Sequence, residues 1–194
     1  MTPQASPLVS IHALSRSLTL RGCLLVLLAA LHGPAGAQST QTPATVDAYT
    51  EVGRLMRAGQ IDEAMSRADR YLQAQPRDPQ MRFMKGVLQS QKGQSADAMV
   101  TFQRLTDEFP ELPEPHNNLA ALLARQNRYA EALDALQAAV RARPDYATAL
   151  ENLGDVYIAL AMEAYQNANK AMPSQPRAAS KRLAAEQLLK SSAP

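Results

Sequence analysis

The sequence predicts an all-α protein, a solenoid of about four helix–turn–helix units closed by a helix at the C-terminal end. Three markers recur at one fixed interval: an acid–alanine pair, a later proline and an earlier glycine or asparagine. A fixed period of about 34 residues indicates stacked supersecondary units. The markers are Glu63-Ala64, Asp97-Ala98 and Glu131-Ala132; Pro76, Pro110 and Pro144; and Gly59, Gly93 and Asn127.

Each marker has a physical role in a pair of helices. Glycine or asparagine ends a helix in a left-handed turn, and the following acid lies in the first turn of the next helix, where the macrodipole favours negative charge. The alanine allows two helices to approach closely. Proline ends the second helix because it has no N–H and clashes with the preceding turn. Apolar periodicity between the markers predicts two helices of about 13 to 15 residues in each unit.

The third unit shows this periodicity most clearly. Its apolar residues recur at the three-and-four spacing of amphipathic helices. They are Leu119, Ala120, Leu122 and Leu123 on the first helix, and Ala132, Leu133, Leu136, Ala139 and Val140 on the second.

At residues 116–144 the sequence reads "HNNLAALLARQNRYAEALDALQAAVRARP" and resembles a tetratricopeptide repeat. It has that family's leucine–small–aromatic pattern, its Y-x-E-A step and its closing proline. The resemblance implies a right-handed solenoid over residues 46–176 that binds other proteins. It places the units at 45–78, 79–112, 113–146 and 147–176.

The fourth unit departs from the pattern. The step from Leu119 to Glu131 is two residues longer than the step between their counterparts, Leu153 and Glu163. No Gly, Asn or Pro lies between Asp155 and Tyr165. One long helix is therefore favoured over a kinked pair.

The tail at 177–194 predicts a capping helix with a solvated outer side. Its leucines, Leu183, Leu188 and Leu189, would form its apolar face. Its four bases and few bulky apolar residues make it a weaker candidate for a helix lying on a membrane.

The first 37 residues predict a secretory signal peptide. They contain arginines but no acid, a nine-residue apolar run at 23–31, and small residues at Ala35 and Ala37, which is the pattern of such peptides. A bilayer span needs about 20 apolar residues, so a membrane anchor is disfavoured.

Cleavage after Ala37 would export the chain to the periplasm or the medium, with a flexible lead-in at 38–45. The signal segment carries two of the 20 bases and none of the 18 acids, so the mature net charge is zero. Without a basic excess, nucleic-acid binding is not expected. The only cysteine is Cys23, so the mature chain has no disulfide or thiolate metal site.

No residue pattern indicates catalysis, a metal or a cofactor. His116 is the single histidine left after cleavage. It lies where the related repeats carry a large inward side chain, so a packing role is expected. Glycines are isolated and form no phosphate-binding loop.

The resemblance implies a concave groove lined by the first helix of each unit. Tyr49 and Phe83 are expected to give it an apolar end. Asn118 and Asn152 are expected to point into it and to hold the backbone of an extended peptide, because an amide both donates and accepts. The candidate partner-binding residues are Tyr49, Phe83, Asn117, Asn118, Arg125, Asn152 and Asp155.

These features predict a non-catalytic adaptor that binds a peptide or a protein of the cell envelope. The alternative is a structural subunit of an envelope assembly, or a self-associating scaffold, with no free-peptide ligand. A homo-oligomer is compatible with both. Neither hypothesis requires membrane insertion after signal cleavage.

Overall fold

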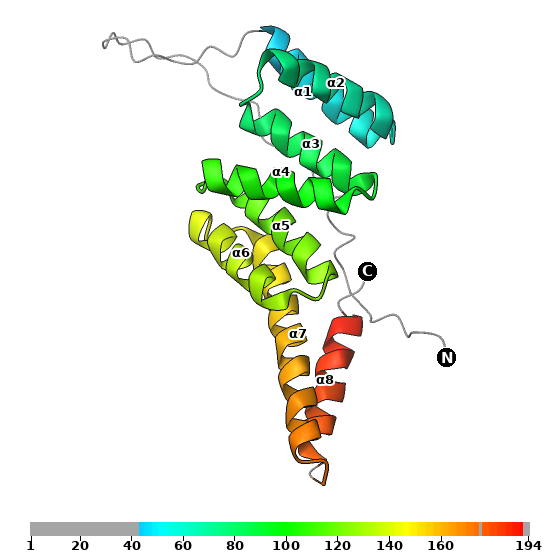
Figure 1. The fold of residues 1–194 in the computed structure, drawn as a ribbon, viewed down its shortest axis with the longest axis vertical. Coiled ribbons are helices and arrows are strands. Elements are labelled where there is room, and N and C mark those ends of the chain that lie inside the picture. Colours follow the sequence, from blue (N-terminus) through cyan, green and yellow to red (C-terminus); the bar gives the residue numbers. More distant parts are fainter. Residues whose placement is uncertain (1–42, 175, 192–194) are drawn as a thin grey trace, which may run out of the picture.

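The computed structural model describes residues 43–174 and 176–191. The expected signal peptide, its cleavage site and residues 38–42 of the lead-in lie outside these ranges. The described residues form eight α-helices and no strand, which confirms the all-α solenoid (Figure 1). The helices are α1 (Pro43–Arg57), α2 (Ile61–Ala74), α3 (Pro79–Gln91), α4 (Ser95–Glu108), α5 (Pro113–Arg125), α6 (Tyr129–Ala142), α7 (Ala147–Ala171) and α8 (Arg177–Ser191).

The first six helices form three stacked pairs. Each helix contacts the next along the chain, and contacts also join α1 to α3 and α5 to α7. The first helix begins at Pro43, so residues 43–45 of the expected lead-in are helical. Proline suits this first position because its fixed φ is already helical and its missing N–H would have no partner there. Pro79 and Pro113 begin α3 and α5 in the same way.

The turns within the pairs have the expected left-handed residues. Gly59, Gly93 and Asn127 have φ of 72°, 77° and 59°. At the first turn, the N–H of Gly59 donates to the Met56 carbonyl at 3.1 Å, and the next N–H donates to the Leu55 carbonyl at 3.0 Å. This bonding pattern closes a helix with a Schellman motif.

The core of the array centres on α5. Every residue from Leu119 to Ala124 is buried, as expected for a helix enclosed by its neighbours. Helices α3 and α4 approach closely at Gly86, where an added Cβ would lie 2.6 Å from the ring of Phe102. Glycine at this position therefore makes room for the ring.

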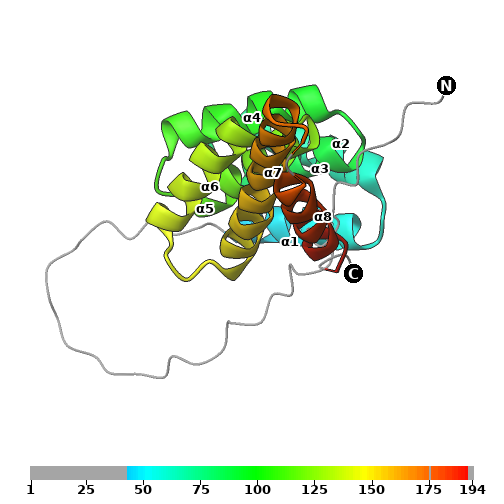
Figure 2. The same cartoon turned by 90° about the horizontal axis from the view of Figure 1, so that it is seen from below.

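The fourth unit is one continuous helix of 25 residues, α7, rather than a kinked pair. Its distal half extends beyond the stacked pairs, and α8 packs along it (Figures 1 and 2). On α8, Ala185 and Leu189 are buried, four residues apart on one face, whereas Leu183 and Leu188 are exposed. The prediction that three leucines form the packed apolar face of α8 is therefore wrong for Leu183 and Leu188. Within the described residues, no helix is long and apolar enough to cross a membrane.

Candidate partner-binding surfaces

Tyr49 lies at the N-terminal end of the expected groove, and its hydroxyl group forms hydrogen bonds within the protein. Its hydroxyl donates to Asp78 at 2.5 Å and lies 3.1 Å from the hydroxyl of Tyr71. Burial, and then the bond to Asp78, raise the pKa of Tyr49 above its ordinary value. Asp78 also caps α3 by accepting from the Met81 N–H at 2.7 Å. Tyr49 therefore links α1 and α2 to the start of α3, and its hydroxyl is already engaged.

Phe83 lies at the edge of the core. Its ring packs against that of Phe102, with centroids 5.8 Å apart and planes tilted by 48°. The side chain is half-buried, so part of it faces outward. Phe83 both supports the α3–α4 pair and offers apolar surface to a partner.

The asparagine amides that the sequence placed in the groove form hydrogen bonds within the protein. Asn117 is fully buried, and its Oδ1 accepts from Nδ2 of Asn152 at 2.9 Å. The Nδ2 of Asn118 donates to the Glu114 carbonyl of its own helix at 2.9 Å. Asn117 therefore cannot touch a partner in this conformation, and its place in the groove is corrected to one between α5 and α7.

The Asn117–Asn152 bond was missed because the repeat period pairs Asn152 with Asn118. Neighbouring helices in a stack are offset, so side-by-side residues need not be equivalent ones. Asn117 and Asn152 are separated by 35 residues, one more than the repeat period. The offset between α5 and α7 therefore brings these two side chains together, although they are not equivalent in the repeat. The Nδ2 of Asn117 has no partner among the described residues.

The charged residues of the candidate set are available to a partner. Arg125 is exposed at the end of α5, and Asp155 is half-buried on α7. Burial, and then the neighbouring Glu151, raise the pKa of Asp155. Among the described residues, neither Arg125 nor Glu151 forms an ion pair, whereas Arg82, Lys85 and Arg143 each bind an acid of another helix.

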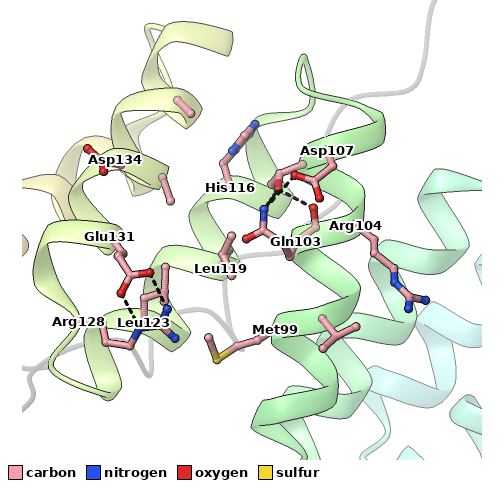
Figure 3. A pocket seen from close by; sticks show the side chains of 14 residues that line it. Met99, Gln103, Arg104, Asp107, His116, Leu119, Leu123, Arg128, Glu131 and Asp134 are labelled. Atoms are coloured by element: carbon pink, nitrogen blue, oxygen red, sulfur yellow. Dashed lines mark hydrogen bonds and ion pairs between the residues drawn. The ribbon is translucent and has the colours of Figure 1, made fainter.

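A cleft of about 700 Å³ lies between α4 and α6, floored by α5 (Figure 3). Leu119 and Leu123 supply its apolar floor, while Arg128 and Glu131 pair with each other at 2.5 Å on one wall. Sequence reasoning did not find this cleft, because the resemblance directed attention to the first helices, and two of its sides are second helices.

His116 lines the same cleft and is half-buried there. Its Nε2 lies 3.1 Å from the Pro110 carbonyl, and burial lowers its pKa. No group of three or more His, Cys, Asp or Glu residues in the described ranges could hold a metal ion. The arrangement suits a packing role for His116.

Comparison with known proteins decides the family. The sequence matches the TPR repeat family at residues 122–160, and the family of anaphase-promoting complex, cyclosome, subunit 3 at residues 57–139. This chain is a tetratricopeptide repeat protein. Tetratricopeptide repeats generally mediate protein–protein interaction and are typically non-catalytic scaffolds.

Two curated relatives match part of this tetratricopeptide repeat protein. It is 30% identical over 109 residues to the probable biofilm formation methyltransferase WspC of Pseudomonas putida, covering 56% of this chain and 26% of that protein. It is 36% identical over 75 residues to the TPR repeat-containing thioredoxin TTL4 of Arabidopsis thaliana, covering 39% of this chain and 11% of that one. The chain thus spans only about a quarter or less of the length of these relatives.

A solved structure shows the same fold. The thermophilic TPR protein TTC0263 of Thermus thermophilus aligns with a TM-score of 0.55 at 20% identity, over 72% of this chain and 80% of that one. At this identity the likeness concerns the fold alone.

Proposed function

We propose that this protein is a non-catalytic adaptor that binds an extended peptide, or a segment of a partner protein, along the first helices of its units. One observation carries the proposal: Arg125 on α5 and Glu151 on α7 are exposed charges without an ion pair among the described residues. The two helices are in contact. A partner that carries an acid opposite Arg125 and a base opposite Glu151 would be complementary to this pair of charges. Such complementarity would fix the orientation of the bound partner.

Half-buried apolar residues support the same surface. Phe83 and Val87 on α3 and Ile158 on α7 are partly accessible, and covering such apolar surface with a partner favours association. The Nδ2 groups of Asn118 and Asn152 already donate to acceptors within the protein, so the donor part of the expected peptide-backbone contact is not available in this conformation. Charge and apolar contact therefore carry recognition in this proposal.

Arg125→Ala and Glu151→Ala should each weaken binding of the main partner at least tenfold, which corresponds to about 1.4 kcal/mol. The partner would be identified by mass spectrometry after capture from an envelope extract, and its affinity then measured with purified proteins. Arg141→Ala is the matched control, because Arg141 is an exposed arginine on α6 without an ion pair among the described residues. If both groove variants bind as well as the control, the structural-subunit alternative is favoured.

We further propose that the adaptor acts in the periplasm or outside the cell. The support is the signal-peptide pattern of the first 37 residues, with its basic start, its short apolar run and its Ala35-x-Ala37 ending. N-terminal sequencing of the exported protein should begin at Gln38. An exported or cell-associated protein that retains residues 16–31 would contradict this localisation.

A further inference from the structure

The end of the hairpin formed by α7 and α8 is strongly basic, whereas the rest of the protein is acidic. Residues 165–182, which we call the hairpin tip, contain four bases and no acid; the bases are Lys170, Arg177, Lys181 and Arg182. The chain after residue 37 has equal numbers of acids and bases, so the remainder of it carries four more acids than bases. The charge of the protein is therefore separated along its length.

The hairpin tip lies beyond the stacked pairs, at the opposite end of the molecule from α1 (Figure 1). The ammonium group of Lys181 lies 5.5 Å from the centroid of the Tyr165 ring, so these two residues are level with each other across the hairpin. Tyr165 is six residues before the end of α7, and Lys181 is four residues after the start of α8. At about 1.5 Å per residue the hairpin tip is roughly 9 Å deep, and all four bases lie within it.

The bases of the hairpin tip are available to an anionic partner. Lys170 and Arg177 are exposed on either side of the turn, and among the described residues neither forms an ion pair. Lys181 is also exposed, and its contact with a tyrosine ring leaves its charge without an acid. Glu186, the nearest acid along α8, pairs with bases of its own helix. Three of the four bases therefore have no acid partner within the described ranges.

An apolar residue lies at the outermost point of the hairpin tip. Met172, in the turn, is 55% exposed, and Lys170 and Arg177 flank it in the chain. Pro173 and Pro176 of the same turn are also exposed. An apolar end with bases on both sides suits a membrane interface, where the apolar group reaches the boundary of the acyl chains and the bases lie at the level of the phosphates.

We propose that the hairpin tip docks on the surface of an anionic membrane, where its bases bind lipid phosphates and Met172 enters the interface. The association is peripheral and does not span the bilayer. Two features favour a lipid surface over an acidic protein. The tip is a projection rather than a groove, and no hydrogen bond among the described residues holds Lys170 or Arg177 in place. Such side chains can follow the laterally mobile phosphates of a bilayer, but they present no fixed pattern to a rigid partner.

This docking orients the whole protein. An anionic surface attracts the basic hairpin tip and repels the acidic remainder of the chain. The stacked pairs therefore stand away from the membrane, with their first helices open to a partner. Membrane docking and groove binding use different residues, so either can fail without the other.

Cosedimentation with lipid vesicles tests the proposal, using the protein from Gln38 onward, which contains every described residue. Vesicles of phosphatidylglycerol and phosphatidylcholine in equal parts should bind the protein at least tenfold more tightly than vesicles of phosphatidylcholine alone. Salt at about 0.5 M should weaken this binding, because it screens the charges. The double variant Lys170→Glu with Arg177→Glu should lose at least tenfold in affinity for the anionic vesicles.

A matched double variant controls for net charge. Arg70 on α2 and Arg104 on α4 are exposed and form no ion pair among the described residues, so Arg70→Glu with Arg104→Glu changes the net charge by the same amount. This control should bind the anionic vesicles within about twofold of the parent, because its charges lie far from the tip compared with the screening length. Arg125→Ala should also bind them like the parent. Equal losses in the two double variants, or no preference for anionic vesicles, would overturn the proposal.

A fluorescent reporter tests the position of Met172. The chain has no tryptophan, so Met172→Trp introduces a single one, and its emission should shift to shorter wavelength when anionic vesicles are added. Val100→Trp is the control, because Val100 is similarly exposed but lies on α4, and its emission should not shift. An unshifted Met172→Trp emission would contradict entry into the interface. Self-association without vesicles that the Lys170→Glu and Arg177→Glu changes abolish would instead assign the tip to an acidic surface of a second copy.

Discussion

Ala161→Pro should lower the free energy of unfolding by about 3 kcal/mol or more. Ala161 lies near the middle of α7, far from both of its ends. Proline there would remove the hydrogen bond to the Tyr157 carbonyl and place its ring against that carbonyl. The break would fall between the half of α7 that packs on α5 and α6 and the half that extends beyond them. Urea denaturation followed by circular dichroism measures the loss.

Ala147→Pro is the matched control for this substitution. Ala147 is the first residue of α7, and its equivalents in α3 and α5 are already proline, Pro79 and Pro113. The control should change stability by only a few tenths of a kcal/mol, because proline is tolerated at the first helical position. Equal stability of the two variants would mean that the chain turns near residue 161 and that α7 is not continuous.

The helices could be predicted from the sequence because their ends depend on local chemistry. A left-handed residue at Gly59, Gly93 or Asn127 acts within two or three residues of its own position, and its effect is visible in the sequence. The same logic predicted the long α7 from the absence of such a residue. The start of α1 was misplaced because a proline after a polar stretch fits both a flexible segment and the first turn of a helix.

The site was harder to predict, because it depends on contacts between units. Equivalence by period assigned Asn118 and Asn152 one role, but the stack brings Asn117 next to Asn152 instead. Tyr49 was assigned to an apolar pocket from its ring alone, and the Asp78 that binds its hydroxyl lies 29 residues away. Distances and offsets between helices are not encoded in any one segment, so such partners are visible only in the folded chain.

The turn and packing glycines differ in what the sequence reveals about them. Gly59 and Gly93 are required by their own positive φ, which is a local property. Gly86 is required by the ring of Phe102, which lies on the next helix. The repeat alignment shows that a small residue recurs at 86, 120 and 154, but only the structure shows that one of the three positions is open.

Phe102→Ala should lower the free energy of unfolding by about 3 to 5 kcal/mol, the usual cost of removing a buried aromatic side chain. Phe102 is 1% exposed, packs against Phe83 and fills the space that Gly86 leaves. Its loss would open a cavity between α3 and α4. Val100→Ala on the same helix is the control and should cost far less, because Val100 is 51% exposed.

A second substitution distinguishes this mechanism from general weakening of α4. In the parent protein, Gly86→Ala should destabilise, because its Cβ would lie 2.6 Å from the Phe102 ring and overpacking costs about 1 to 3 kcal/mol. In the Phe102→Ala background the ring is gone, so the same change should stabilise by up to about 1 kcal/mol through helix propensity alone. A change of sign across this double-mutant cycle, read from urea denaturation, is the expected result. Equal effects of Gly86→Ala in both backgrounds would show that the glycine and the ring do not interact.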